Sequence, residues 1–314
     1  MRADRLPVTP IQRLGSFDTG WDLYVKRDDL LPFCFGGNKA RIAECFMDDM
    51  RSKGGTCMVA YGSTRSNLSR ALACACSSEG VRCVVISPSD DDGSRPRSFN
   101  SRIVEMLGAE VVPCGKGFVR ETVREVLGRL EGEGEMPYYI YGDETGAGNE
   151  EVPVRAYRAV SDEIALQERS MGVRFDRVYI ALGTGMSYAG LLAGDAAAGR
   201  ERRVIGISVA RSATAASGHV ARYLAASLGA SCPHGPIEVT DRFLHGGYGC
   251  ADEGQKGTML SLLAREGVPS DETYVGKAFD GMLNLLAEDR SPGGSALFIH
   301  TGGTPLFFDN LEGR

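Results

Sequence analysis

Short apolar runs alternate with amphipathic stretches along the whole chain. Several runs are continuously apolar, a pattern typical of parallel strands that are buried on both faces. The stretches between them repeat apolar residues at helical spacing. In the helix expected near 39–53, this apolar stripe consists of Ala43, Phe46, Met47 and Met50. The alternation predicts a doubly wound α/β fold.

The boundaries of the elements follow from the same pattern. We expect strands at 22–26, 56–61, 82–87, 110–114, 138–141, 177–182, 204–209, 237–239 and 296–300. We expect helices near 39–53, 66–79, 98–107, 118–131, 153–171, 188–199, 213–229, 253–266, 276–288 and 305–310. The stretch 142–153 is rich in Gly, Asp and Glu and ends in proline, so we expect a domain boundary there.

Composition and charge exclude several classes of protein. The 314 residues are 43% hydrophobic and 24% charged, which is typical of globular proteins. The net charge of −6 offers no basic field for nucleic acid. No apolar run is long enough for a membrane span or a signal peptide, so we expect a cytoplasmic protein with no membrane partner. The cysteines and histidines show no metal-ligand spacing, and no metal site is expected.

Glycine is abundant, with 41 residues, and one glycine-rich loop has the form of an anion site. The segment 178–190 predicts a strand, a loop and then a helix, an arrangement that turns backbone N–H groups and the positive helix end toward an anion. It is not the dinucleotide fingerprint, because Gly190 comes two positions too late. A turn without a ligand stays an alternative. The loop residues are Gly183, Thr184, Gly185, Met186 and Ser187.

A second glycine loop, 298–305, also follows an apolar strand and opens a helix with Pro305 in its first turn. Two such loops in one α/β chain favour a phosphorylated ligand other than NAD or ATP.

Lys39 is the candidate for covalent chemistry. It follows Gly36, Gly37 and Asn38 at the start of an expected helix, with Asn38 as its N-cap. A cation at the positive end of a helix has a lowered pKa, and desolvation lowers it further. Such a lysine can form a Schiff base. A solvated helix start is the alternative, but a reactive lysine and a phosphate loop together indicate pyridoxal 5′-phosphate (PLP).

Several ordered motifs then resemble one family. Lys26–Asp29 followed by Gly36–Arg41 is similar to the lysine motif of the D-cysteine desulfhydrase and 1-aminocyclopropane-1-carboxylate (ACC) deaminase family. Further segments agree in order: Thr9–Leu14, Gly62–Asn67, Asp271–Ala278 and His300–Gly303. The resemblance implies the tryptophan synthase beta-like architecture of fold-type II PLP enzymes, with two doubly wound α/β domains. It also implies a homodimer, a large PLP-binding domain at 1–44 and 150–314, and a small domain at 45–149.

The resemblance also implies roles for individual residues. Lys39 would bind PLP and move protons, Ser66 would bind the substrate carboxylate or assist proton transfer, and Asn67 would hydrogen-bond the PLP phenolic oxygen. The phosphate would be held by Gly183, Thr184, Gly185, Met186 and Ser187. Tyr274 would lie against the pyridine ring, Thr301 would face its nitrogen, and Tyr248 matches a second active-site tyrosine of the family. Other interpretations stay open: Tyr274 as a core aromatic, Tyr248 as a loop aromatic, and Ser66 with Asn67 as the cap of the next helix. Lys277 is assigned to structure or surface.

The expected reaction is β-elimination on a small amino acid, giving pyruvate, ammonia and the leaving group. A neutral Thr301 hydroxyl at the ring nitrogen makes the ring a weaker electron sink than a carboxylate would, which favours elimination over transamination. Val275 stands where ACC deaminases carry glutamate, and Thr301 is also more similar to the desulfhydrases. Cysteine-synthase-like β-replacement and ACC deamination stay as alternatives. A PLP-binding protein without turnover is a further one, because Leu68 and Met186 depart from the family pattern.

Overall fold

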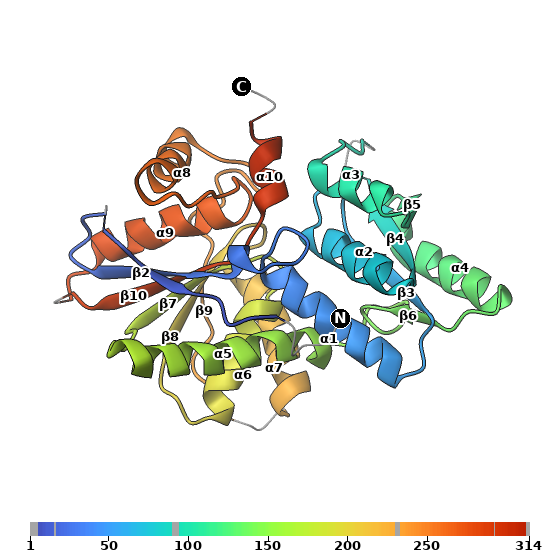
Figure 1. Ribbon diagram of the computed structural model, residues 1–314, viewed down its shortest axis with the longest axis horizontal. Helices are drawn as coiled ribbons and strands as arrows, with labels where there is room; N and C mark the ends of the chain where they lie inside the picture. The colour runs from blue at the N-terminus through green and yellow to red at the C-terminus, as the bar shows by residue number, and fades with distance from the viewer. Residues whose placement is uncertain (1–5, 16, 90–93, 230–232, 292, 312–314) are drawn as a thin grey trace. The chain divides into compact units, whose positions relative to one another are not determined.

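The computed structural model describes residues 6–15, 17–89, 94–229, 233–291 and 293–311. Contacts between Cα atoms divide the chain into two compact units (Figure 1). The small unit contains Lys39–Pro153, and the large unit contains Pro7–Asn38 together with the chain from Val154 onward. The domain limits given by the resemblance stay a prediction.

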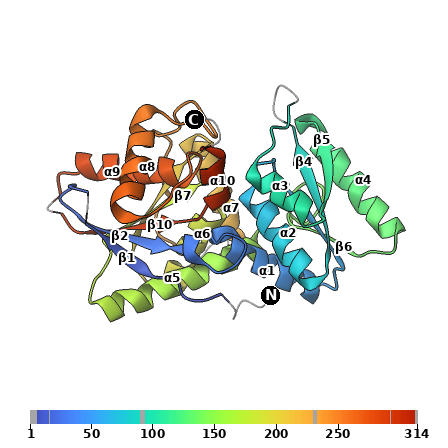
Figure 2. The same ribbon diagram turned by 45° about the horizontal axis from the view of Figure 1, so that its top comes forward.

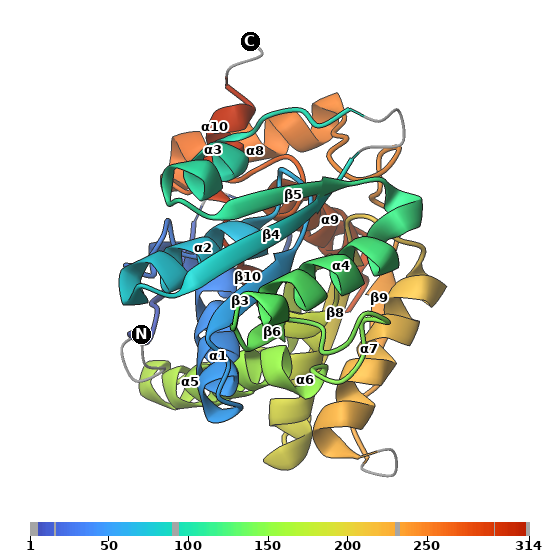
Figure 3. The same ribbon diagram turned by 90° about the vertical axis from the view of Figure 1, so that its right-hand side faces the viewer.

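The small unit is built on a four-stranded parallel sheet in the order β5-β4-β3-β6. Its central strands are almost entirely buried, as their continuous apolar sequences predicted. Figure 3 shows α2 and α4 on opposite faces of this sheet. The strands are β3 (Cys57–Tyr61), β4 (Arg82–Pro88), β5 (Glu110–Cys114) and β6 (Pro137–Tyr139). The helices are α1 (Asn38–Ser52), α2 (Asn67–Glu79), α3 (Phe99–Met106) and α4 (Val119–Gly132), with a short 3-10 turn η3 (Lys116–Phe118).

The large unit is built on a six-stranded sheet in the order β1-β2-β10-β7-β8-β9, parallel except for the β1–β2 pair. Helices α8 and α9 cover one face, and α5, α6 and α7 cover the other (Figures 1 and 2). The strands are β1 (Ile11–Leu14), β2 (Asp22–Arg27), β7 (Arg177–Leu182), β8 (Arg203–Ser208), β9 (Glu238–Thr240) and β10 (Ser295–His300). The helices are α5 (Glu151–Met171), α6 (Met186–Ala197), α7 (Ala213–Leu228), α8 (Glu253–Glu266), α9 (Val275–Glu288) and α10 (Thr304–Asp309), with a 3-10 turn η2 (Asp28–Leu30).

The predicted fold class is confirmed, and every expected strand and helix has a counterpart within a few residues. Strand β1 was not expected, because it is a short, partly exposed edge strand with little apolar pattern. In the part of the chain that the structure describes, no helix is long and apolar enough to cross a membrane. Among the same residues, no group of three or more His, Cys, Asp or Glu side chains could hold a metal ion.

The parallel core of the large unit positions the loops that matter for function. Phe279 of α9 and Phe298 of β10 meet edge to face at 5.2 Å in its hydrophobic core. Such a pair contributes about 0.5–1.5 kcal/mol beyond its buried area. The loops after β7, β8 and β10 leave the carboxyl ends of the strands, where open α/β sheets bind their ligands.

Candidate active site

The loop after β7 has the backbone of an anion cradle. Helix α6 begins at Met186, and its N-cap Gly185 has φ +94°, a conformation that favours glycine. A Cβ atom on Gly185 would lie 3.0 Å from Val220 Cγ2. No side chain of the described residues caps this helix start. The N–H groups of its first turn are therefore suited to an anion.

Two side chains of the large unit hold this loop. The Asn38 amide donates to Ser187 Oγ at 2.9 Å, and the Arg211 guanidinium donates to the Gly183 carbonyl at 2.8 Å. Ser187 and Met186 are buried, whereas Gly183 and Thr184 are half-buried. Sequence reasoning missed Arg211, although its position just after an expected strand is a signal that it could reach the carboxyl end of the sheet.

The second glycine loop packs against the segment that precedes Lys39. A Cβ atom on Gly37 would lie 2.7 Å from the Thr301 carbonyl oxygen, and one on Gly302 would lie 2.5 Å from Gly37 Cα. The Asn38 N–H donates to the Thr301 carbonyl at 3.1 Å. The close approach of the two backbone segments therefore explains why these positions are glycine. A second phosphate-binding loop is not needed to explain them. Thr301 itself is buried.

Asp271 organises the start of α9. Its carboxylate is fully buried and accepts N–H groups from Thr273 at 2.9 Å, Tyr274 at 2.7 Å and Val275 at 3.2 Å. Burial raises its pKa to about 6, and the backbone N–H groups partly oppose this shift. A Cβ atom on Gly303 would collide with this carboxylate. Asp271 therefore fixes the backbone of Tyr274 and restricts the Thr301–Gly303 loop.

Tyr274 and Tyr248 form a pair, and Tyr274 lies beside the Gly183–Ser187 loop. Their hydroxyls are 2.7 Å apart, and their rings meet edge to face at 5.7 Å. A Cβ atom on Gly183 would lie 3.3 Å from Tyr274 Cε1. Burial, and then the neighbouring Tyr248, hold the Tyr274 pKa well above its ordinary value. Tyr274 is therefore a neutral phenol at physiological pH.

Lys39 is the second residue of α1 and is half-buried. Desolvation lowers its pKa to about 8, in the direction that the sequence predicted. The expected capping role of Asn38 is wrong. The helix begins at Asn38 itself, and its amide is used on Ser187 instead.

Ser66 and Asn67 lie together at the start of α2 in the small unit. Ser66 is the N-cap, and its hydroxyl oxygen accepts the Ser69 N–H at 3.1 Å. The capping interpretation is therefore confirmed for Ser66. A capping hydroxyl retains its own proton as a donor, so this role leaves a contact with substrate open.

Asn100, a neighbour that sequence reasoning missed, determines which way the oxygen and the nitrogen of the Asn67 amide face. Asn100 Nδ2 donates both to the Arg65 carbonyl and to Asn67 Oδ1, each at 3.0 Å. A backbone carbonyl only accepts, so the Asn100 atom that faces Arg65 is the amide nitrogen. The Asn67 atom that faces the same nitrogen is then its oxygen. Asn67 consequently presents its Nδ2 on the other side, as a donor.

Comparison with known proteins identifies the family. The family model described as pyridoxal-phosphate dependent enzyme matches residues 4–302, which is nearly the whole chain. The chain belongs to this family of PLP-dependent enzymes. Its cofactor is PLP, and it is an enzyme that acts on a small amino acid.

The relatives of this PLP-dependent enzyme agree with the resemblance to the ACC deaminase family. The chain is 30% identical to the ACC deaminase of Methylobacterium nodulans and 32% identical to that of Burkholderia multivorans. Each match covers 95% of this chain and 92% of the relative. The crystal structure of an ACC deaminase homologue is 28% identical with a TM-score of 0.82, covering 97% of this chain and 93% of that one. An O-ureido-L-serine synthase, 19% identical with a TM-score of 0.69 and covering 98% and 95%, shares the fold.

The residues of this PLP-dependent enzyme fit its cofactor. The uncapped start of α6 behind Gly185 suits a phosphate, and the Arg211 cation at Gly183 adds positive charge to the same loop. Lys39 has the lowered pKa that imine formation needs. The Asn67 donor matches an acceptor such as the phenolic oxygen of PLP.

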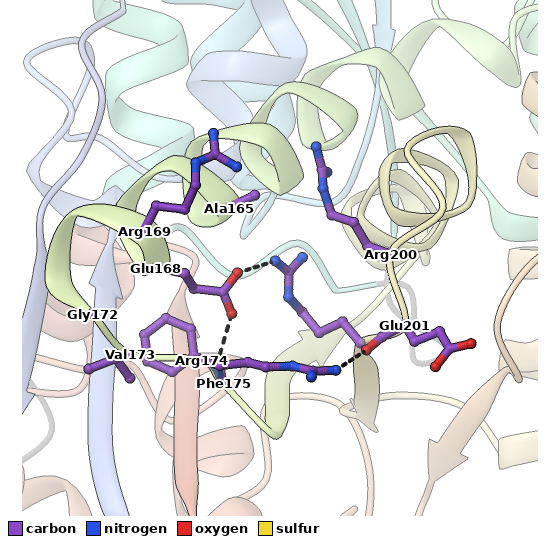
Figure 4. Close-up of a pocket in the computed structure, with 10 residues that line it drawn as sticks. Ala165, Glu168, Arg169, Gly172, Val173, Arg174, Phe175, Arg200 and Glu201 are labelled. Carbon is purple, nitrogen blue, oxygen red and sulfur yellow. Dashed lines mark hydrogen bonds and ion pairs between the residues drawn. The ribbon is translucent and has the colours of Figure 1, made fainter.

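Two cavities of the enzyme each lie within a single unit. One, of about 120 Å³, lies in the small unit and is lined by Ser66, Ser69, Ser87 and Arg95, among others. The other, of about 510 Å³, lies in the large unit before β7 and β8, at the amino ends of these strands. Glu168 accepts bonds there from Arg202 and from the Phe175 N–H. Figure 4 shows Glu168 and Phe175 among the residues that line this cavity. This second cavity contains none of the expected site residues, so we do not assign it to the active site.

Proposed function

We propose that the protein is a PLP-dependent lyase that eliminates a β-substituent from a small amino acid, releasing pyruvate and ammonia. The observation that supports this reaction best is the hydrogen-bonded pair of Tyr248 and Tyr274 beside the Gly183 loop. Elimination requires a base for the α-proton and an acid for the leaving group. Lys39 and the tyrosine pair supply these two functions.

Lys39 is the base and the covalent anchor of the cofactor. When bound, PLP withdraws electrons from the substrate α-carbon. With a pKa of about 8, about one tenth of the free Lys39 amine is neutral at pH 7 and able to take a proton. The N–H groups of Gly185–Ser187 would hold the phosphate, and the Asn67 amide would donate to the phenolic oxygen.

Tyr274 is the acid in this proposal. Its raised pKa keeps the phenol protonated, and the Tyr248 hydroxyl 2.7 Å away can replace a donated proton. A thiol or similar group that leaves the β-carbon would take this proton. Ser66, with the hydroxyl proton that capping leaves available, would bind the substrate carboxylate.

Two residues favour elimination over other PLP reactions. Thr301 is buried directly after β10 and, in this proposal, would offer a neutral hydroxyl rather than a carboxylate to the pyridine nitrogen. A ring nitrogen without a carboxylate partner is a weaker electron sink, which suits a reaction in which the leaving group takes the electrons. Val275 is fully buried and apolar, so it supplies no acid or base where the resemblance gives ACC deaminases a glutamate.

ACC deamination is the second candidate. It is favoured by the relatives at 30–32% identity over 95% of the chain, which carry that name. Val275 and Thr301 are the residues that count against it.

The test is a comparison of substrates on the holoenzyme. D-cysteine, L-cysteine and ACC are each supplied, and pyruvate, ammonia and sulfide are measured. We expect pyruvate, ammonia and sulfide in equal amounts from one cysteine enantiomer. Ammonia from ACC alone would establish the second candidate. A new amino acid formed when thiols are added would indicate β-replacement, and no reaction with any of them would contradict the lyase.

A further inference from the structure

Lys277 is a buried cation whose partners are backbone carbonyls. It is the third residue of α9, and none of its side chain is exposed, which excludes the surface role. Its Nζ donates to the Leu244 carbonyl at 2.8 Å and to the Gly247 carbonyl at 2.8 Å. A buried ammonium is unfavourable unless its donors are satisfied, so both bonds are needed.

The two carbonyls belong to one tight turn. The Gly247 N–H donates to the Leu244 carbonyl at 2.9 Å, and the backbone passes through left-handed conformations at His245 (φ +50°), Gly246 (φ +94°) and Gly247 (φ +132°). Residues other than glycine are uncommon in such a conformation, although histidine adopts it more often than most, and contacts from the surrounding structure stabilise it. Lys277 supplies two of those contacts.

The turn leads directly into Tyr248, whose hydroxyl meets that of Tyr274. Tyr274 is the N-cap of α9, the helix that carries Lys277. A closed ring of contacts therefore runs from Tyr274 through the first turn of α9 to Lys277. From Lys277 it passes through the Gly247 carbonyl to Tyr248, and from there back to Tyr274.

We propose that Lys277 is a positioning residue that fixes the Leu244–Gly247 turn and thereby holds the Tyr248 hydroxyl against Tyr274. This inference rests on the proposed function of the two tyrosines. Lys277 takes part in no chemical step of the proposed reaction, and the inference gives it a positioning role. A hydrogen bond of fixed length between two phenols needs both rings to be placed accurately, and Lys277 connects their two backbone segments.

The experiment compares Lys277→Met, which keeps the apolar stem and removes the donors, with the wild type and with Lys256→Met. Lys256 is on α8 and forms an ion pair with Glu253. Hydrogen exchange of the amides in 244–250 is measured on the holoenzyme, together with kcat and KM. Lys277→Met is also made in a Tyr248→Phe background. Lys277→Gln, which keeps an uncharged NH2 donor group, replaces the Met variant if that variant does not fold.

We expect amide exchange in the turn to become about tenfold faster in Lys277→Met and to stay unchanged in Lys256→Met. We expect kcat to fall about 10- to 100-fold with a smaller change in KM, and no further fall in the Tyr248→Phe background. Unchanged exchange, or an equal fall in kcat in both backgrounds, would overturn the positioning role. An enzyme inactive on every amino acid would reject the proposed function alone, and the exchange rates would still decide whether Lys277 fixes the turn.

Discussion

The side-chain amide of Asn38 donates a hydrogen bond of 2.9 Å to the hydroxyl of Ser187, a residue 149 positions away in the chain. Both side chains are buried. Asn38 directly precedes Lys39, and Ser187 lies in the first turn of α6. The residue before the reactive lysine is therefore fixed to the proposed phosphate loop.

Asn38→Ala removes this bond and leaves a buried hydroxyl without its donor, which costs about 1–3 kcal/mol. We expect the dissociation constant of PLP to rise about tenfold or more, because 1.4 kcal/mol corresponds to a factor of ten. Titration of the apoprotein with PLP, followed by absorbance, measures it. Asn284→Ala, which removes an amide bonded to Asp280 within α9, is the control and should leave PLP affinity unchanged. Equal affinities for all three proteins would show that the bond has no part in cofactor binding.

Gly185→Ala places a Cβ atom in the phosphate loop at φ +94°. A left-handed alanine costs about 1–2 kcal/mol, and the Val220 side chain must also move. Gly199→Ala is the matched control, since Gly199 has φ +61° with open space around it. We expect both variants to unfold at lower temperature, and only Gly185→Ala to bind PLP more weakly. Full PLP affinity in both variants would show that the loop at Gly185 does not bind the phosphate of PLP.

In the proposed function, Lys39 would react with PLP only as the neutral amine. Because its pKa is lowered to about 8, the rate of attachment should rise with pH up to about 8 and then level off. An ordinary lysine would give a rate that still increases beyond pH 10. Stopped-flow absorbance of apoprotein mixed with PLP over a range of pH gives the profile. A rate that is still rising at high pH would show that the amine is not desolvated.

Asp271 makes stability depend on pH in a defined direction. Its folded pKa of about 6 lies above the ordinary value of 3.8, so the folded state binds the proton more tightly than the unfolded state does. Its contribution to the free energy of unfolding is complete below about pH 4 and is lost as pH rises through about 6. Asp271→Asn removes this dependence while keeping an oxygen acceptor for the α9 amides.

Denaturant unfolding of wild type and Asp271→Asn from pH 4 to 7 checks the effect. As pH rises from 4 to 7, the free energy of unfolding of the wild type should fall relative to that of Asp271→Asn. A difference that is constant with pH would mean that the carboxyl group titrates normally in the folded protein.

Local features could be predicted from the sequence. Apolar runs, helix starts and the glycine loop after β7 each depend on neighbours in the chain, and the structure has strands, helices and a loop at these places. The lowered pKa of Lys39 also had the predicted direction. Strand β1 was missed because an edge strand needs little apolar sequence.

The contacts that organise the site could not be predicted. Asn38 reaches Ser187, Lys277 reaches Leu244, and Asn100 reaches Asn67, all across long separations in the chain. Each of the three donors is an ordinary polar residue whose role depends on how remote elements pack. Asp271 is different, because it bonds to the N–H groups of Thr273, Tyr274 and Val275, which are near it in the chain, although the sequence showed it only as the first residue of a motif.

The most direct test of the account is the absorbance spectrum of the purified protein with and without amino acids. Lysine-bound PLP absorbs at about 410–430 nm. We predict this band in the wild type and its absence in Lys39→Ala. We also predict that a β-substituted amino acid such as cysteine changes the band of the wild type while pyruvate accumulates. A band that survives in Lys39→Ala, or one that no amino acid alters, would contradict the proposed lyase.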